Sequence, residues 1–538
     1  MSQELRIGVK KNKMGVGTIV FMIYCLCAAG AFGIEAMIPA AGPGLTIVML
    51  LTIPFVWGLP MALAATELGA ARPCEGGFYK WIQEALGEFW GFQAGWWKTI
   101  ANFVDSSVYV ILAGGYFAIM TGADKGTTYA FQVCVIAIIV IINLRGIQES
   151  GKLSTVIGWL VLAVFALIAV VGFLHFDQSP VEPFIPPGQS LAESIGGGIA
   201  IGIWMYSGYE AMSAIGGEVE NPRVIPKATI IAVPLIAATY IIPTIAGLGS
   251  IGQWELWEEG IGSQVGYGTV LSTYLPGGIW VAVFGVVAIL ANCSIFNSWV
   301  TAAPRVLYAM ADDNLFAKSV TKVSKKRGVP YIPVLIMAVV DLILCTFDFS
   351  VVLCIEVLLI IATQVLLFIS MMVFRIKKPD MERPIKVPGP KAFIMVFFSI
   401  PILVALVAYL LNGTDYFLGG LVGLATGPIA YFFCKRKWGG LTKKAPEAYP
   451  LNEKTKLGKG DIFSMAVICL VLCALATIGA VFLPMYEGSW GPEYYLDVYG
   501  VDCFTKLISA IRWFAVVSGI LAIVLYIIGK RVEDRRIT

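Results

Sequence analysis

The fold of this chain is decided by two short stretches, GAFGIE at residues 30–35 and YSGYE at residues 206–210. Each stretch places a carboxylate beside glycine inside an otherwise apolar segment. In hydrocarbon every backbone N–H and C=O group must be bonded internally, so a glycine-broken helix is tolerated only where it is buried in protein or lines a wet cavity. Two such breaks at corresponding positions of two halves predict a substrate site at the interface of two structural repeats.

The composition places the chain in a lipid bilayer. Of its 538 residues 58% are hydrophobic and 14% are charged, whereas about a quarter of the residues of a soluble domain are charged. The net charge of +3, with lysine and arginine spread over the loops, predicts no nucleic-acid partner. The first apolar run begins near Met14 and has no small-residue cleavage site, so it is predicted to be a retained helix and not a signal peptide.

The cysteines and the histidine argue against a metal centre and against an enzyme. The 11 cysteines lie mostly in apolar segments without a Cys-x-x-Cys pair, and His175 is the single histidine. No zinc or haem site is therefore expected. The sequence also has no Ser-His-Asp set, glycine-rich phosphate loop or metal-binding pair of carboxylates at a known spacing. We expect no cofactor, no bound metal and no catalytic activity.

Fourteen membrane spans are predicted from the length of the apolar segments. Their centres lie near Cys27, Pro54, Tyr109, Ala137, Val164, Ile203, Ala238, Ile295, Val339, Leu359, Ile402, Thr426, Leu472 and Leu521. Loops rich in lysine and arginine should face the cytoplasm. Those at 72–80, 145–152, 223–227, 318–327, 375–386 and 435–459 all fall on one side, together with both termini. The pattern predicts a multi-pass plasma-membrane protein with both termini in the cytoplasm.

The loops also divide the chain into segments. We expect cytoplasmic tails at 1–13 and 531–538, spans one to five in 14–175, spans six to ten in 191–375, spans 11 and 12 in 391–434, a cytoplasmic linker at 435–461, and an accessory hairpin of two helices at 462–530. The sequence assigns no role to that hairpin.

Several ordered motifs carry a family resemblance. They are GIE at 33–35 with AGP at 41–43, PFVWGLP at 54–60, ATEL at 65–68, GGFYKW at 76–81, FWGFQ at 89–93, GWWK at 95–98, YSGYE at 206–210, GEVENP at 217–222 and RPIKVP at 383–388. Over residues 14–435 the chain resembles the amino acid, polyamine and organocation (APC) superfamily of transporters. Within it, the chain is most similar to the branch of polyamine and L-type amino acid permeases.

The resemblance implies an all-helical core of two inverted repeats, spans one to five and six to ten, in which the first helix of each repeat is broken. Gly30 and Gly33 fit the first break, and Ser207 and Gly208 fit the second. A broken helix exposes N–H groups at one end and C=O groups at the other, so it can hold a substrate carboxylate and an amine. Alternatively, these small residues only let neighbouring helices pack closely.

Three carboxylates are the predicted contacts of a substrate amine, because intramembrane acids are costly and mark functional sites. Asp105 lies midway along span three, and Glu35 and Glu210 flank the two breaks. In the resembling family these segments line a central cavity. The alternative for Glu35 and Glu210 is a local role, accepting hydrogen bonds from N–H groups that the break frees. Asp341 and Glu356, in the second half, have no assigned role.

Trp204 stands six residues before Glu210, where the resembling superfamily commonly carries an aromatic gate. An indole that closes over a bound cation contributes about 1 to 2 kcal/mol by a cation–π contact. The alternative is an ordinary tryptophan of the core or the lipid face. Tyr109 and Tyr206 are further aromatic candidates for the substrate site.

Coupling to protons or to exchange is favoured over coupling to sodium. A lysine that some relatives carry in span five is replaced here by Val161, and a buried carboxylate such as Glu35 or Glu210 can carry a proton. Span eight has oxygen-bearing side chains that suit either Na⁺ or hydrogen bonds between helices, namely Asn292, Ser294, Asn297, Ser298 and Thr301.

The expected function is secondary active transport of a polyamine, a monoamine or an amino acid by alternating access. Polyamine-type relatives often have a glutamate where this chain reads PMAL at 60–63 and LLF at 366–368. Monoamines and amino acids are therefore candidate substrates beside long polycations. A sodium-coupled transporter of neutral amino acids is the alternative. A channel or a receptor with a transporter-derived fold is a rival class.

Overall fold

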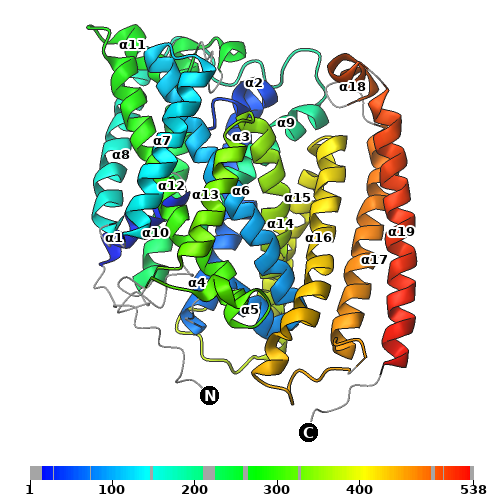
Figure 1. Cartoon of the computed structure of the whole chain (residues 1–538). Coiled ribbons are helices and arrows are strands. Elements are labelled where there is room, and N and C mark those ends of the chain that lie inside the picture. Colours follow the sequence, from blue (N-terminus) through cyan, green and yellow to red (C-terminus); the bar gives the residue numbers. More distant parts are fainter. Residues whose placement is uncertain are drawn as a thin grey trace.

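The computed structural model describes residues 15–27, 30–72, 74, 76–145, 150–209, 224–257, 265–324, 329–452, 454–485, 491–500 and 502–532. Within these ranges every regular element is a helix (Figure 1). The α-helices are α1 (Val16–Cys27), α2 (Met37–Ala41), α3 (Pro43–Ile53), α4 (Leu59–Ala71), α5 (Gly77–Leu86), α6 (Glu88–Thr121), α7 (Lys125–Leu144), α8 (Ser150–Leu174), α9 (Leu191–Met205), α10 (Val224–Ile251), α11 (Tyr267–Tyr274), α12 (Trp280–Asp312), α13 (Tyr331–Leu344), α14 (Phe349–Lys377), α15 (Lys391–Leu411), α16 (Thr414–Trp438), α17 (Lys459–Phe482), α18 (Pro492–Tyr499) and α19 (Cys503–Arg531).

The described part of the chain confirms an all-helical membrane protein. It contains 11 helices that are long and apolar enough to cross a bilayer, one of them formed by α3, a π turn at Pro54–Gly58 and α4 together. The three remaining predicted centres, Cys27, Ile203 and Val339, fall in the shorter apolar helices α1, α9 and α13. The total of fourteen spans and the inverted-repeat arrangement therefore stay predictions.

Helix α6 forms the centre of the bundle. It is the most deeply buried of the long apolar helices and packs against α12, α14, α5, α13 and α7. At ~1.5 Å per residue a helix of 34 residues is about 51 Å long, so α6 runs through the whole height of the bundle. Side chains at different levels of this one helix consequently meet both ends of the molecule.

Two ends of the bundle are distinguished below. Helix α5 lies at the lower end in Figure 1, and α2, α11 and α18 lie at the upper end. These are called the α5 end and the α11 end. The 3-10 turn at Gly440–Lys443 follows α16 directly. Helix α16 itself continues to Trp438, so the first residues of the predicted linker are helical.

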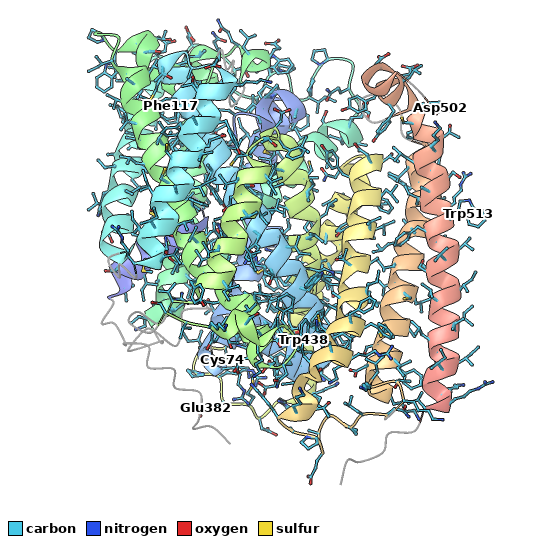
Figure 2. All side chains as sticks on the ribbon, viewed as in Figure 1. Cys74, Phe117, Glu382, Trp438, Asp502 and Trp513 are labelled. Carbon is cyan, nitrogen blue, oxygen red and sulfur yellow. The ribbon has the colours of Figure 1, made fainter. Side chains whose placement is uncertain are left out.

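The hairpin of α17 and α19 stands at one edge of the bundle (Figure 1). The two helices pack mainly on each other, and they reach the rest of the molecule through α16 and, for α17, α6. The side chain of Trp513 on α19 points away from the bundle (Figure 2) and is 67% exposed. Such an apolar outer face suits contact with lipid tails.

Candidate functional site

The first break separates α1 from α2. Helix α1 ends at Cys27 and α2 begins at Met37, and Gly30 and Gly33 between them have φ angles of 115° and 100°. Residues with a side chain rarely adopt such angles. A Cβ atom on Gly33 would also lie 2.7 Å from Cζ3 of Trp204. Glycine at 33 thus permits both the turn and the close approach of the indole.

The second break follows α9. That helix ends at Met205, Ser207 and Gly208 lie outside helical structure, and Gly208 has a φ of 101°. The Ser207 hydroxyl donates to the carbonyl of Ile203 at 2.7 Å and accepts from the Trp57 indole at 3.2 Å. Gly30, Gly33, Ser207 and Gly208 therefore all lie in non-helical backbone, as the sequence predicted. Glu210 lies outside the described residues.

The aromatic residue Tyr206 anchors the second break to α3. Its side chain is fully buried, and its hydroxyl donates to the carbonyl of Leu50 at 2.9 Å. This contact and that of Trp57 with Ser207 run from the second break to the span formed by α3 and α4. From these contacts we infer that Tyr206 and Ser207 hold the second break in place.

The carboxyl ends of the two broken helices meet at one tyrosine on α10. The Tyr240 hydroxyl lies 3.0 Å from the carbonyl oxygen of Met205 and 3.4 Å from that of Cys27. Met205 is the last residue of α9 and Cys27 the last of α1. The final carbonyls of a helix have no partner within it, so one buried phenol serves both ends. No sequence pattern pointed to Tyr240, because its role depends on two helix breaks that are distant from it in sequence.

Asp105, Tyr109 and Trp204 form one buried cluster. The Trp204 indole N–H donates to Oδ1 of Asp105 at 2.9 Å, and the Tyr109 hydroxyl donates to Oδ2 at 3.4 Å. The rings of Tyr109 and Trp204 stack with centroids 5.8 Å apart. Because Trp204 also covers Gly33, the cluster joins α6 to both broken helices.

Glu35 lies further toward the α11 end. Its side chain is buried, and the Tyr116 hydroxyl lies 3.5 Å from Oε1. Asp105, Tyr109 and Tyr116 share one face of α6, because spacings of four and seven residues return to the same side of a helix. At ~1.5 Å per residue, about 16 Å of helix axis separates Asp105 from Tyr116. The structure thus aligns the two acids along α6 and does not bring them into one contact.

Aromatic rings surround the first break. Phe32 packs against Tyr116, Phe165 and Phe284, with ring centroids 5.5, 5.2 and 5.7 Å apart. A Cβ atom on Gly30 would lie 2.6 Å from ring atoms of Phe32 and Phe165. These buried rings form an aromatic cluster around the first break, next to the Tyr116 that contacts Glu35.

Two of the oxygen-bearing side chains of span eight, Asn297 and Thr301, bond to a neighbouring helix. Asn143 of α7 donates to Oδ1 of Asn297 at 2.7 Å and accepts from the Thr301 hydroxyl at 2.7 Å. The Ser298 hydroxyl bonds back to the carbonyl of Ser294. For Asn297 and Thr301 the described contacts are hydrogen bonds between helices; Ser298 bonds within its own helix. Among the described residues no group of three or more His, Cys, Asp or Glu could hold a metal ion.

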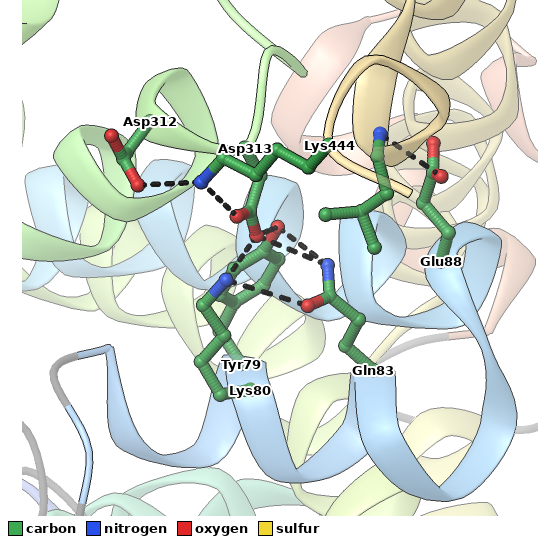
Figure 3. Close-up of polar contacts among 8 residues, drawn as sticks. Tyr79, Lys80, Gln83, Glu88, Asp312, Asp313 and Lys444 are labelled. Carbon is green, nitrogen blue, oxygen red and sulfur yellow. Dashed lines mark hydrogen bonds and ion pairs between the residues drawn. The ribbon is translucent and has the colours of Figure 1, made fainter. Parts of the chain in front are cut away.

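A polar cluster around Asp313 lies at the α5 end (Figure 3). Asp313 follows α12 and binds the ammonium groups of Lys80 on α5 and of Lys444, the latter at 3.2 Å. The Tyr79 hydroxyl donates to the same carboxylate at 2.8 Å and Gln83 at 3.2 Å. Burial by itself raises the pKa of Asp313, but Lys80, Tyr79 and Lys444 together hold that pKa below its ordinary value.

Two further buried acids at this end pair with cations distant in sequence. Glu67 of α4 binds Arg375 and lies 2.9 Å from Nε of Arg383. Glu88 binds Lys435 at 2.6 and 2.8 Å, and both side chains are almost completely buried. Glu67 and Arg383 belong to the motifs ATEL and RPIKVP, yet nothing in the sequence shows that these motifs meet.

Comparisons with known proteins agree with this geometry. A family model described as amino acid permease matches residues 14–419. A probable polyamine transporter of Arabidopsis thaliana is 28% identical over 447 residues, 80% of this chain and 86% of the relative. A polyamine transporter of Oryza sativa is 29% identical over 441 residues, 78% of each chain. A serine/threonine exchanger of Bacillus subtilis is 26% identical over 391 residues, 70% of this chain and 85% of the relative.

The family model spans both broken helices, the whole of α6 and the Asp313 cluster apart from Lys444. The polyamine transporters and the exchanger place the resemblance among transporters and not among enzymes. The chain therefore belongs to the amino acid permease family of the APC superfamily.

Proposed function

We propose that this protein is a secondary active transporter that moves an amine-bearing small molecule by alternating access. The observation that carries the proposal is the Asp105 carboxylate, which accepts a hydrogen bond from Trp204 of one broken helix, while the same indole packs against Gly33 of the other. In this proposal the ammonium group of the substrate binds Asp105, with Gly30, Gly33, Glu35, Tyr109, Trp204, Tyr206, Ser207, Gly208 and Glu210 forming the rest of the site.

The electrostatics of the two broken helices favour a cation. The carboxyl end of a helix carries a partial negative charge, and the carboxyl ends of α1 and α9 converge on Tyr240. The stacked rings of Tyr109 and Trp204 present π faces beside Asp105. A carboxylate, two helix ends and two aromatic rings together attract an ammonium group and repel an anion.

Among amines, a polyamine fits the arrangement best. Asp105 and Glu35 lie on one side of α6 at different heights, about 16 Å of helix axis apart, so a long linear polyamine extends from one acid toward the other, whereas a short diamine binds at one of them. The relatives named polyamine transporters support this substrate class, and the serine/threonine exchanger supports an amino acid as the second candidate. A monoamine would engage Asp105 alone.

Transport is proposed to be proton-coupled or to proceed by exchange. Asn297 and Thr301, two of the groups suited to Na⁺, bond to Asn143, which favours this coupling over sodium. The protein is proposed to reside in the plasma membrane with both termini and the α5 end in the cytoplasm. Trp204 then acts as the gate, since movement of its indole uncovers Asp105 and Gly33 together.

A thermal-shift screen of the purified full-length protein tests the substrate class. Putrescine, spermidine, a primary monoamine and serine are compared with glucose and citrate. A ligand that binds the folded state raises Tm. We expect spermidine and putrescine to raise it most. Stabilisation by glucose or citrate alone would overturn the amine proposal.

Asp105→Asn tests the binding residue. The amide keeps the shape of the side chain but removes its charge, so the Tm shift produced by spermidine should be lost while the Tm of the free protein changes little. Asp348→Asn is the matched control, because Asp348 is an exposed aspartate before α14. If both variants bind spermidine like the wild type, Asp105 is not the amine site.

Counterflow in proteoliposomes tests the class of protein. Preloaded unlabelled spermidine should accelerate entry of labelled spermidine through a carrier, whereas a channel or a receptor gives no acceleration. Replacing Na⁺ by choline in the same assay should leave the rate unchanged. A rate that depends on Na⁺ would favour the sodium-coupled alternative.

A further inference from the structure

Asp341 on α13 is one of the buried acids that the proposed function does not use. Its side chain is fully buried in the last turn of this apolar helix. Oδ1 lies 2.6 Å from the Ser106 hydroxyl of α6, and Oδ2 has no hydrogen-bond partner among the described residues. None of the ion pairs in the described part of the chain includes Asp341.

The surroundings of Asp341 offer it no counter-charge. The titratable side chains on the elements packed against α13 are Glu88, Lys98, Asp105, Tyr109 and Tyr116 on α6, Lys125, Tyr129 and Cys134 on α7, Cys293, Arg305, Tyr308 and Asp312 on α12, and Lys318 on the 3-10 turn at Lys318–Thr321. No hydrogen bond or ion pair described in the structure joins any of them to Asp341. Cys345 lies one turn further along the chain, and Tyr129 bonds the Leu342 carbonyl instead.

Ser106 gives Asp341 a hydrogen-bond partner in both of its protonation states. The Ser106 oxygen lies 2.6 Å from Asp341 and 3.0 Å from the carbonyl of Phe103, but a serine hydroxyl has one hydrogen. When Asp341 is protonated, it donates to Ser106, which donates to Phe103. When Asp341 is charged, Ser106 turns its hydrogen to the carboxylate. Rotation of one O–H bond thus accompanies the loss or gain of the proton.

The packed structure favours the protonated state. Burial of a carboxylate without a cation costs several kcal/mol. Burial of a neutral carboxyl group that is hydrogen-bonded to Ser106 costs much less. Asp341 can therefore release its proton only in a conformation that admits water beside α13. A carrier that exposes alternate sides provides such conformations, so the proton that binds on one side is released to water on the other.

The position of Ser106 links this acid to the substrate site. Ser106 is the neighbour of Asp105 in α6, and Asp105 binds Trp204 and Tyr109. We propose that Asp341 is the proton-carrying residue of this transporter and that Ser106 connects its protonation to the substrate site through α6. The inference rests on the proposed function and adds the coupling ion and its site.

Infrared difference spectroscopy tests the protonation directly and needs no substrate. The full-length protein at pH 7 should show the C=O stretch of a protonated carboxylic acid that disappears in Asp341→Asn. Ser106→Ala should retain this band and shift its frequency, because the hydroxyl partner is lost. Asp348→Asn, the exposed control, should leave the band unchanged. A band that survives in Asp341→Asn without loss of intensity would overturn the proposal.

Uptake into proteoliposomes tests the coupling, with labelled spermidine as the probe. Counterflow by the wild type tests carrier activity separately. If the wild type shows no counterflow, the proposed function is wrong, and the role of Asp341 is not what failed. We expect Asp341→Asn to keep counterflow and to lose the stimulation of uptake by an imposed pH gradient. Stimulation equal to that of the wild type in Asp341→Asn would refute the coupling role, as would wild-type uptake that no pH gradient stimulates.

Discussion

Two buried aspartates, Asp341 in the bundle and Asp313 at the α5 end, have opposite surroundings. Both side chains are essentially inaccessible to solvent. Asp341 shares one hydrogen bond with the neutral Ser106. Asp313 binds the ammonium groups of Lys80 and Lys444 and accepts a third bond from Tyr79. Equal burial thus hides two different chemical situations.

The difference shows that counter-charges, and not burial, decide what a buried acid can do. A carboxylate that is paired with cations stays charged and holds elements together. A buried carboxyl group without a cation is stable in its neutral form and becomes charged only when water enters. Asp313 therefore suits a structural role at the α5 end, and Asp341 suits a change of protonation. The predictions below test this contrast.

The largest expected effect is that of Asp313→Asn on stability. The amide leaves Lys80 without its carboxylate and leaves Lys444 with Asp312 alone, at a cost of about 2 to 3 kcal/mol. Asp341→Asn replaces a neutral carboxyl by a neutral amide and should cost less than about 1 kcal/mol. Thermal unfolding of the two purified variants in the same detergent measures the contrast. Equal losses of Tm would remove the distinction between the two sites.

The dependence of stability on pH is the second prediction. The pKa of Asp313 is lowered in the folded protein, so its contribution is fully present above the ordinary aspartate pKa of about 4 and is lost as the pH falls through the lowered value. The difference in Tm between the wild type and Asp313→Asn should be constant at neutral pH and shrink in acid. A difference that grows in acid contradicts the assignment of Lys80 as its main partner.

The smallest expected effect concerns a neutral hydrogen bond in the bundle. Tyr240→Phe removes the hydroxyl that serves the carbonyls of Met205 and Cys27, at a cost of about 1 kcal/mol. Because these carbonyls form the proposed cation-attracting helix ends, spermidine binding should change as well. Tm and the spermidine-induced shift are both measured. Tyr409→Phe is the comparison, since Tyr409 also bonds a main-chain carbonyl, that of Leu358, away from the breaks.

The sequence predicted the helix breaks because their signal is local. Glycine and a carboxylate within a few residues of an apolar segment mark Gly33 and Gly208 without knowledge of any partner. Trp204 and Asp105 were each identified as candidates from single segments, and the structure adds that they bond to each other. Their roles in transport remain a proposal.

The remaining contacts escaped prediction because they join distant parts of the chain. Ser106 and Asp341 are separated by 235 positions, and Tyr240 meets Cys27 across 213. A serine in an apolar helix is unremarkable by itself, since its hydroxyl can bond within its own helix, and a buried tyrosine usually finds some partner for its hydroxyl. Only the packing of α6 against α13, and of α10 against both breaks, gives these residues a partner.

The pairing of Glu88 with Lys435 has a consequence for how the protein is made. The two residues lie 347 positions apart, and ribosomes release the chain from its amino end. Glu88 therefore enters the membrane long before its lysine is synthesised. The base of α6 must stay accessible to water, or to the insertion machinery, until α16 arrives. Completion of the twelfth predicted span then seals this acid, so a message truncated before Lys435 yields a bundle that cannot close at the α5 end.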